Sequence, residues 1–321
     1  MFFRIFSCYF VLTLLPFALA DLSSLSQRPG LSLLPFALPF LTLLPFALAD
    51  LPPLPQRSGF SLLYEDDFNN GLNPSIWTAR NNYVHTRWDL VCFISDDVKV
   101  ENGNMVIVTR VNPVTCTDAE GSTRNYRYSS GWADTNGKLA VRNGLVEIRA
   151  KLPEPLFRMW PSSFLLSQEN NLDQGKCWPL STEIDLYEVA GGFGGDANTG
   201  LGSNAMCSSY HWGNQCFVDL GAKNTGCLSS VELCPHCDYH TYASAWDDTK
   251  IEFFIDGRLY FTIDKSSGAT IPVPDPMVVI IQSALAWWIP GTSVPGLDPD
   301  VGGPGVQVHL IDWIRVWQRS V

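Results

Sequence analysis

The chain has 321 residues, of which 46% are apolar and 12% aromatic, and its formal net charge is −11 at pH 7. No run of basic residues is dense enough to neutralise phosphates, which argues against nucleic acid or an anionic membrane as a partner. A neutral sugar polymer, by contrast, is compatible with an acidic cleft.

The first twenty residues are typical of a secretory signal. Arg4 supplies the positive charge, an apolar run follows, and Ala18-Leu19-Ala20 offers a small-residue cleavage site. Residues 12–34 then recur at 41–63, with 18 of 23 positions identical at an offset of 29. Two copies are too few for a repeat protein, which needs at least three to bury a core. The repeat therefore indicates a duplicated signal.

We interpret residues 1–49 as this duplicated secretory signal region, cleaved near 20 or near 49, and residues 50–63 as a linker. A transmembrane segment is the competing interpretation, but prolines and Arg28 interrupt the apolar stretch below the roughly 20 residues that a membrane helix needs. We expect a secreted protein, extracellular or in the cell wall, that acts as a monomer and has no contact with a membrane after signal removal.

Residues 64–321 have the pattern of one all-β domain. Aromatic and β-branched segments alternate with Gly, Asn and Pro, and no long stretch has helical periodicity. We expect a jelly-roll sandwich of two curved antiparallel sheets, similar to concanavalin A. Asp256-Gly257 predicts a hairpin turn, because both residues tolerate positive φ. The expected strands include 105–111, 144–152, 251–254, 259–263, 277–283 and 306–317.

Eight cysteines remain once Cys8 leaves with the signal. An even number in a secreted protein predicts up to four disulfides, whose connectivity the sequence leaves open. Cys234 and Cys237 form a C-x-x-C pair, which also occurs in redox enzymes and, with His236 and His240 nearby, in zinc sites. The segment leads into strands and lacks a second cysteine pair at matching spacing, so a structural disulfide is favoured.

The segment from Glu183 to Glu188 carries three carboxylates in six residues. In a strand, Glu183 and Asp185 share one face while Ile184 takes the other. A one-residue β-bulge around Leu186-Tyr187 would bring Glu188 to the same face, and bulges are common next to active sites. One ionised and one protonated carboxyl side by side is what glycoside hydrolysis requires. A solvated acidic edge strand is the alternative, which the alternating apolar residues make less attractive.

The surroundings of this segment resemble glycoside hydrolase family 16, and within it the laminarinase-like endo-1,3-β-glucanases. Members carry a Trp-Pro strand, a bulged E-I-D-x-x-E strand and a His-aromatic-Gly strand in this order. The chain has them at Trp160-Pro161, at 183–188 and at His211-Trp212-Gly213. The resemblance runs from about residue 64 to 318.

The resemblance implies a retaining endo-β-glucanase that cleaves internal β-1,3 or β-1,3/1,4 bonds of a β-glucan without a cofactor. It assigns Glu183 as the nucleophile, Asp185 as its electrostatic assistant, and Glu188 as the acid/base. It places His211 near Glu188 or the sugar. A non-catalytic β-glucan-binding protein on the same fold and a cell-wall transglycosylase are the alternatives. Three intact acids favour the enzyme, because two carboxylates are required.

The further site residues also follow from the resemblance or from side-chain type. Indole faces stack on sugar rings, although large aromatics more often fill cores. The chain has Trp287-Trp288 where laminarinases often have Gly-Gly-x-Trp-Pro-Gly, and Tyr83 where the family's Asn-Asn-Glu motif has Glu. Asp312 and Gly103 occupy the positions of a structural calcium site. The predicted substrate-binding residues are Asn81, Trp160, His211, Trp212, Trp287 and Trp288.

Overall fold

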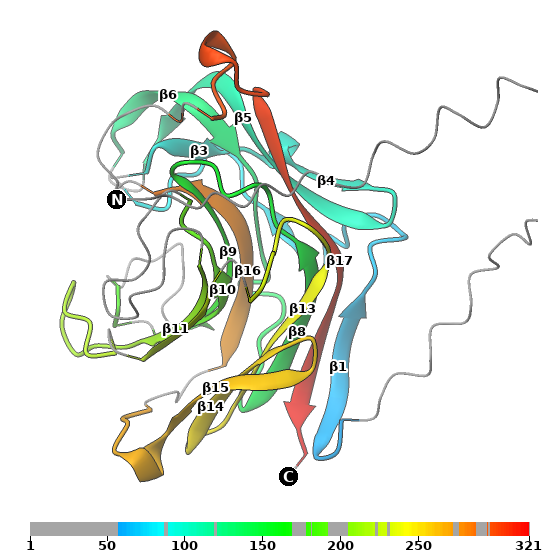
Figure 1. Cartoon of the computed structure of the whole chain (residues 1–321), viewed down its shortest axis with the longest axis vertical. Helices are drawn as coiled ribbons and strands as arrows, with labels where there is room; N and C mark the ends of the chain where they lie inside the picture. Colours follow the sequence, from blue (N-terminus) through cyan, green and yellow to red (C-terminus); the bar gives the residue numbers. More distant parts are fainter. Residues whose placement is uncertain are drawn as a thin grey trace, which may run out of the picture. The chain divides into compact units, whose positions relative to one another are not determined.

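Two β-sheets packed face to face make up the computed structural model (Figure 1). It describes residues 57–86, 89–118, 121–168, 178–180, 182–191, 205–221, 224–229, 232–271, 276–286, 294 and 296–320. The expected signal region at 1–49 and the pair Trp287-Trp288 therefore lie outside the described residues.

The larger sheet has ten strands within the described residues, in the order β15-β14-β13-β8-β17-β5-β6-β3, with β1 beside β17 and β4 beside β5. Its pairings are antiparallel except that β3 runs parallel to β6. The strands are β1 (Phe60–Asp66), β3 (Val91–Phe93), β4 (Val98–Glu101), β5 (Asn104–Thr117), β6 (Thr123–Ser130), β8 (Gly144–Lys151), β13 (His240–Trp246), β14 (Lys250–Ile255), β15 (Arg258–Asp264) and β17 (Val306–Arg319).

The smaller sheet has seven strands in the same described ranges, in the order β12-β11-β10-β9-β16-β7-β2. The acidic segment is β10, flanked on both sides by antiparallel partners. The strands are β2 (Thr78–Ala79), β7 (Trp132–Asp134), β9 (Met159–Ser167), β10 (Glu183–Glu188), β11 (Met206–His211), β12 (Thr225–Leu228) and β16 (Met277–Leu285). Short 3-10 turns occur at η1 (Ser95–Asp97), η3 (Lys265–Ser267) and η4 (Pro299–Val301).

The main core fills the space between the sheets. It takes Ile184, Leu186 and Tyr187 from β10, together with Ile148 and Ile314 of the larger sheet, all of them buried. A second apolar cluster includes Trp132, Phe164 and Ile280. Successive side chains of a strand point to opposite faces of the sheet. Phe164 and Ile280 therefore lie on one face, and their neighbours Leu165 and Ile281, which belong to the main core, lie on the other. The smaller sheet is therefore covered over part of both faces. The predicted all-β jelly roll is confirmed.

The first and last strands of the larger sheet are neighbours. β1 pairs antiparallel with the end of β17, Phe60 facing Arg319 and Asp66 facing Ile314. The first described strand thus begins at Phe60, four residues before the expected start of the domain at 64. The predicted hairpin is present, with φ of 50° at Asp256 and 76° at Gly257.

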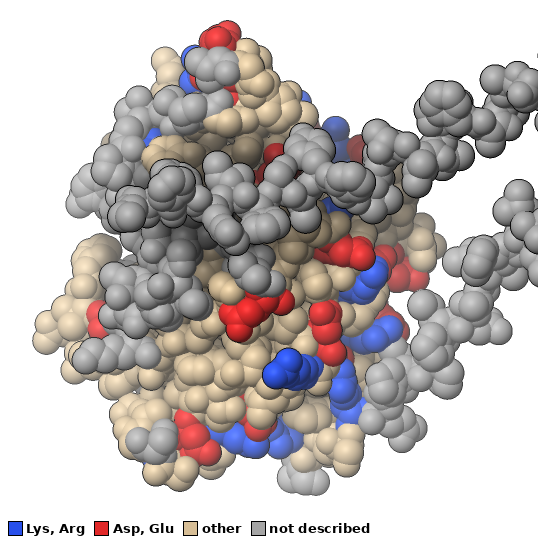
Figure 2. Space-filling model, viewed as in Figure 1, with Lys and Arg blue, Asp and Glu red and all other residues tan. Residues whose placement is uncertain are grey.

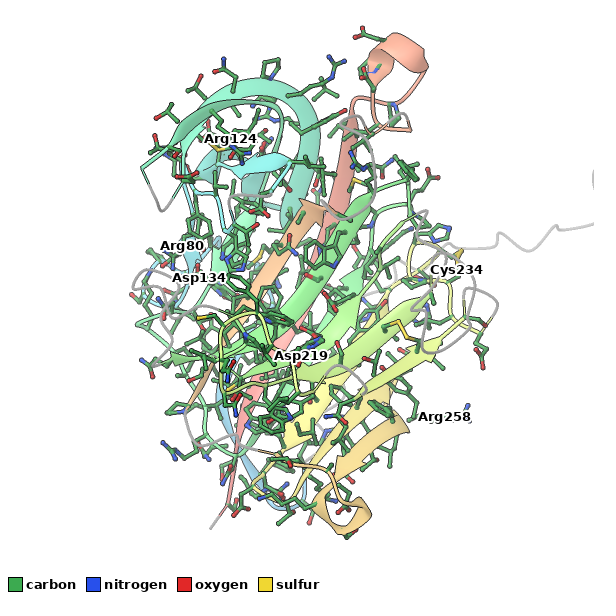
Figure 3. All side chains as sticks on the ribbon, turned by 90° about the vertical axis from the view of Figure 1, so that its left-hand side faces the viewer. Arg80, Arg124, Asp134, Asp219, Cys234 and Arg258 are labelled. Carbon is green, nitrogen blue, oxygen red and sulfur yellow. A yellow bond between two sulfur atoms is a disulfide. The ribbon has the colours of Figure 1, made fainter. Side chains whose placement is uncertain are left out.

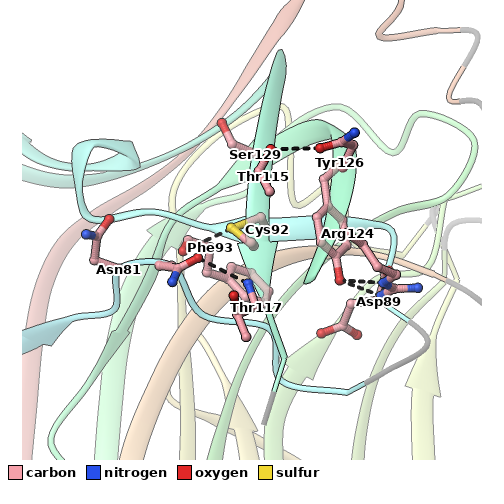
Figure 4. Close-up of a disulfide and its surroundings, with 12 residues drawn as sticks. Asn81, Asp89, Cys92, Phe93, Thr115, Thr117, Arg124, Tyr126 and Ser129 are labelled. Atoms are coloured by element: carbon pink, nitrogen blue, oxygen red, sulfur yellow. Dashed lines mark hydrogen bonds between the residues drawn. A yellow bond between two sulfur atoms is a disulfide. The ribbon is translucent and has the colours of Figure 1, made fainter. Parts of the chain in front are cut away.

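Disulfides account for each of the seven cysteines in the described part of the chain. The pairs Cys92–Cys116 (Figure 4), Cys207–Cys227 and Cys234–Cys237 are formed, and Cys216 is also disulfide-bonded. The predicted disulfide of the C-x-x-C pair is present. Cys207–Cys227 joins β11 to β12 across a cross-strand pair, which ties the edge of the smaller sheet to the strand next to β10.

Alkylation of the denatured, unreduced protein should label none of these seven cysteines, whereas prior reduction should expose all of them to the reagent. Removing the Cys207–Cys227 bond with serine at both positions should lower the free energy of unfolding by about 2–4 kcal/mol, because the bond closes a short loop in the unfolded chain. Denaturant unfolding measures the second effect. Labelling of several of these cysteines without reduction would contradict the assignment.

Acidic and basic side chains are interspersed over the face viewed in Figure 2. The ion pairs of the larger sheet include Arg315 with Glu65 at 2.8 Å and Lys250 with Glu252 at 2.7 Å. No helix among the described residues is long and apolar enough to cross a membrane.

Candidate active site

A β-bulge in β10 puts the three acids of the site on one face. The register of β10 shifts between Asp185 and Tyr187 against β9, and between Asp185 and Glu188 against β11. Leu186 and Tyr187 consequently both turn into the main core, and the next residue, Glu188, returns to the face of Glu183 and Asp185. The bulge that the sequence predicts at Leu186-Tyr187 is confirmed.

The neighbouring strand β11 supplies polar partners in register with the acids. His211 lies opposite Glu183, and Ser209 lies opposite Asp185. Residues directly opposite each other on one face are in contact range. The pairing therefore brings His211 and Ser209 close to the carboxylates of Glu183 and Asp185. One carboxylate oxygen each from Glu183 and Asp185 and one ring nitrogen of His211 lie within 4.8 Å of one another.

Each glutamate accepts a hydrogen bond from an indole. The Trp178 Nε1–H donates to Glu183 Oε2 at 2.9 Å, and the Trp160 Nε1–H donates to Glu188 Oε1 at 3.0 Å. Trp160 is half-buried on β9, while Trp178 is 37% exposed at the start of the segment that leads into β10. Both carboxylates of β10 are thereby fixed on one face of the sheet, with an aromatic ring beside each.

Burial and mutual repulsion raise the pKa of both glutamates. Desolvation is the largest cause for Glu188, and the charge of Asp185 adds to it, so that its pKa rises to about 8. The same two causes raise the pKa of Glu183 well above its ordinary value, and the charge of His211 opposes the rise. The charge of Asp185 therefore favours the protonated form of Glu183.

His211 lies between two carboxylates. Its Nδ1 is 2.6 Å from Asp219 Oδ2, and its Nε2 is 3.3 Å from Asp185 Oδ2. Burial lowers its pKa, but the hydrogen bonds to Asp185 and Asp219 outweigh that effect and raise the pKa to about 12. These contacts favour the protonated form of the ring.

Trp212 and Asn81, two further predicted substrate-binding residues, have structural contacts in the described part of the chain. Trp212 follows His211 and packs against the main core. Asn81 is exposed on the loop after β2, where its Oδ1 accepts from the Ser95 backbone N–H at 3.3 Å, near the Cys92–Cys116 bond (Figure 4). The next residue, Asn82, accepts from the Thr117 N–H at 3.2 Å. These two asparagines hold loops together in the described structure.

The predicted calcium site does not fit the groups that surround it. Asp312 forms an ion pair with Arg149, whose guanidinium neutralises this carboxylate. Gly103 lies in the β4–β5 turn with a φ of 70°, close to the Asn69 side chain. Calcium requires six to eight oxygen ligands, preferably anionic. A carboxylate already bound by arginine is a poor ligand, and we assign no role to an ion here.

Three contacts of the site were not predicted, two to the acids and one to His211. Nothing in the sequence indicates that the Trp178 indole donates to Glu183. Ser209 donates its hydroxyl hydrogen to Asp185 Oδ2 and lies two residues before His211, a spacing that a strand puts on one face. Asp219 lies in the loop after β11, and its contact with His211 depends on how that loop folds. Asp219 is labelled in Figure 3.

Comparison with known proteins supports a carbohydrate-active domain. The family model described as Beta-porphyranase A-D, GH16 domain, matches residues 63–319. Glucan endo-1,3-beta-glucosidase A1 of Niallia circulans is 23% identical over 61% of this chain and 27% of that protein. Keratan-sulfate endo-1,4-beta-galactosidase of Sphingobacterium multivorum is 23% identical over 80% of this chain and 54% of that protein. The chain spans about a quarter to a third of the length of the first curated relatives it matches.

Among solved structures, the laminarinase catalytic domain of Thermotoga maritima MSB8 superposes with a TM-score of 0.63 at 25% identity, over 82% of this chain and 99% of that one. The fold, the bulged acidic strand and the family match over most of the chain agree with one another. The protein therefore belongs to glycoside hydrolase family 16, with a GH16 domain of the beta-porphyranase A-D group.

Proposed function

We propose that the protein is a secreted, retaining endo-β-glucanase that hydrolyses internal β-1,3 or β-1,3/1,4 glucosidic bonds. The observation that carries the proposal is the bulge in β10, which puts Glu183, Asp185 and Glu188 on one face with an indole donor on each glutamate. A glycan-binding surface without catalysis does not need two glutamates so arranged.

In the first step, Glu188 donates its proton to the glycosidic oxygen while a Glu183 carboxylate oxygen attacks the anomeric carbon. The bond to the leaving sugar breaks, and a glycosyl ester forms on Glu183 with inverted configuration. The raised pKa of Glu188 suits this role, because the group is still protonated at neutral pH. His211 and the Trp178 N–H stabilise the Glu183 carboxylate as the attacking form.

In the second step, Glu188, now ionised, takes a proton from a water molecule that attacks the anomeric carbon from the opposite side. The ester bond to Glu183 breaks, and the configuration is inverted a second time, which restores the β anomer. A sugar hydroxyl in place of water would give transglycosylation. The same residues therefore serve both reactions, and the acceptor decides between them.

Incubation of the purified protein with laminarin and mixed-linkage β-glucan should release oligosaccharides of several lengths, the pattern of internal cleavage. Proton NMR of the first products should show the β anomer, which appears before mutarotation. An α anomer at early times would contradict the role of Glu183 as a nucleophile. Glycan binding without any cleavage would instead support the non-catalytic alternative.

A β-galactan is the second candidate substrate. The family model is named for β-porphyranases, and one relative is a keratan-sulfate endo-1,4-beta-galactosidase. The catalytic groups described above act at the anomeric carbon, which glucans and galactans share, so they do not discriminate between the two. Porphyran and agarose in the same substrate panel decide between them by which polymer is shortened.

A further inference from the structure

Asp219 connects the loop after β11 to the catalytic face. Its Oδ2 faces His211 Nδ1 at 2.6 Å, and its Oδ1 accepts from the backbone N–H of Gly221 at 2.8 Å and of Trp212 at 3.4 Å. The carboxylate is 11% exposed. The loop from 212 to 221 thus folds around this one side chain, which has the imidazole of His211 as its partner on the other oxygen.

Both nitrogens of the His211 ring face acceptors. Nδ1 meets Asp219, while Nε2 lies 3.1 Å from Ser209 Oγ and 3.3 Å from Asp185 Oδ2. The Ser209 hydroxyl hydrogen is already committed to Asp185. A neutral imidazole has one N–H and would point a lone pair at one of these oxygens. Two N–H donors, and therefore a positive charge, satisfy the geometry.

We propose that Asp219 is a positioning residue that holds His211 as a fixed cation beside Glu183 and Asp185. The effect of this cation on catalysis rests on the proposed function, whereas the charge of His211 does not. The titratable groups that face the ring are Asp185 and Glu183 on β10 and Asp219 on the loop, with Glu188 within electrostatic range on β10. Trp178 covers the ring, at 5.4 Å between centroids, and carries no charge.

The position of the His211 cation determines which carboxylate it stabilises. Glu183 lies directly across from His211 on the neighbouring strand. A positive charge there favours the ionised form of Glu183, which must attack the anomeric carbon, against the repulsion from Asp185. Asp219 carries the compensating negative charge on the far side of the ring, away from β10. It can therefore keep His211 charged without sharing the face of the three acids.

The state of His211 can be measured directly by NMR of protein labelled with ¹⁵N-histidine, its signal being assigned by its loss in H211Q. In the wild-type protein both ring nitrogens of His211 should be protonated at pH 8. In D219N the titration of His211 should fall by about 1–3 pH units, because an adjacent opposite charge shifts a pKa by that amount. The asparagine oxygen can still accept from Gly221, so the loop keeps its fold.

Asp256 offers a matched control. It likewise binds a histidine, with Oδ2 2.8 Å from His240 Nδ1, and accepts a backbone N–H, that of Thr241, at 2.8 Å. It lies at the turn between β14 and β15. The variant D256N makes the same chemical change and should leave the titration of His211 and the activity unaltered.

Kinetics test whether Asp219 acts through His211. On a cleaved polysaccharide, D219N should lower kcat about 2- to 150-fold, the range of coupling between residues in one network, with KM nearly unchanged. In an H211Q background D219N should cause no further loss. Equal losses in both backgrounds would show that Asp219 acts independently of His211 and would overturn the proposal.

Two further outcomes bear on the proposal alone. A neutral His211 ring in the wild-type protein at pH 8, or an unshifted titration in D219N, would refute it even if the enzyme is active. If D219N does not fold, D219S keeps an acceptor for the loop, and the wild-type measurement still decides. Absence of activity on every glycan would reject the proposed function, while the NMR result would still judge the Asp219–His211 pair.

Discussion

Replacement of Glu183 by alanine should abolish cleavage of the polysaccharide that the wild-type protein degrades. No other described side chain on this face is placed opposite His211 and beneath the Trp178 N–H, so no group can form the glycosyl ester in its place. Added azide should restore turnover, because a small anion fits the vacated space and attacks the anomeric carbon. The product should be a glycosyl azide of inverted configuration. Product NMR provides the measurement.

The matched control is E101A, since Glu101 is an exposed glutamate at the end of β4 whose carboxylate lies 3.9 Å from the Lys99 ammonium. This variant should cleave at the wild-type rate and should not respond to azide. A β-configured azide, or substantial cleavage by E183A without azide, would disprove the assignment of the nucleophile.

Replacement of Glu188 by alanine should lower kcat on the natural polysaccharide about 10²- to 10⁴-fold, the usual contribution of a general acid. The glycosylation step on an aryl glycoside with an activated leaving group should lose far less, because that leaving group departs without a proton. The comparison of the two substrates separates the loss of an acid from a general disturbance of the site. Similar losses on both would contradict the role of Glu188.

The pH dependence of the wild-type protein should follow from the same group. Glu188 has a pKa of about 8 and must be protonated to act as the acid. Activity on the polysaccharide should therefore fall as the pH rises through about 8, while glycosylation by the activated aryl glycoside should lack this alkaline limb. Measurement of kcat/KM as a function of pH for both substrates tests this expectation.

The sequence was sufficient for the features that depend on short spacing. The bulge follows from the parity of residues 183, 185 and 188 together with the apolar character of Leu186 and Tyr187, which must both reach the core. The hairpin at Asp256-Gly257 follows from the tolerance of these residues for positive φ. Each is a local consequence of backbone geometry, and each is present in the structure.

Features that depend on the path of the chain could not be predicted from short spacing in the sequence. Asp219 meets His211 because a loop turns back on itself, and no periodicity marks that turn. The sign of the effect of Asp185 on Glu183 also required the structure, since it depends on which charges are buried together. The Cys92–Cys116 and Cys207–Cys227 pairs were among many possible connectivities.

The pairing of β1 with the end of β17 gives the catalytic domain adjoining ends. Phe60 and Arg319 are cross-strand neighbours, so a short peptide between them should allow circular permutation, with new termini opened at an exposed turn such as Asp256-Gly257. The same geometry suits insertion into a longer polypeptide, because the host chain would be interrupted at a single point. A permuted protein that folds and cleaves the same polysaccharide as the unpermuted one would allow the domain to be fused to other proteins through its new termini.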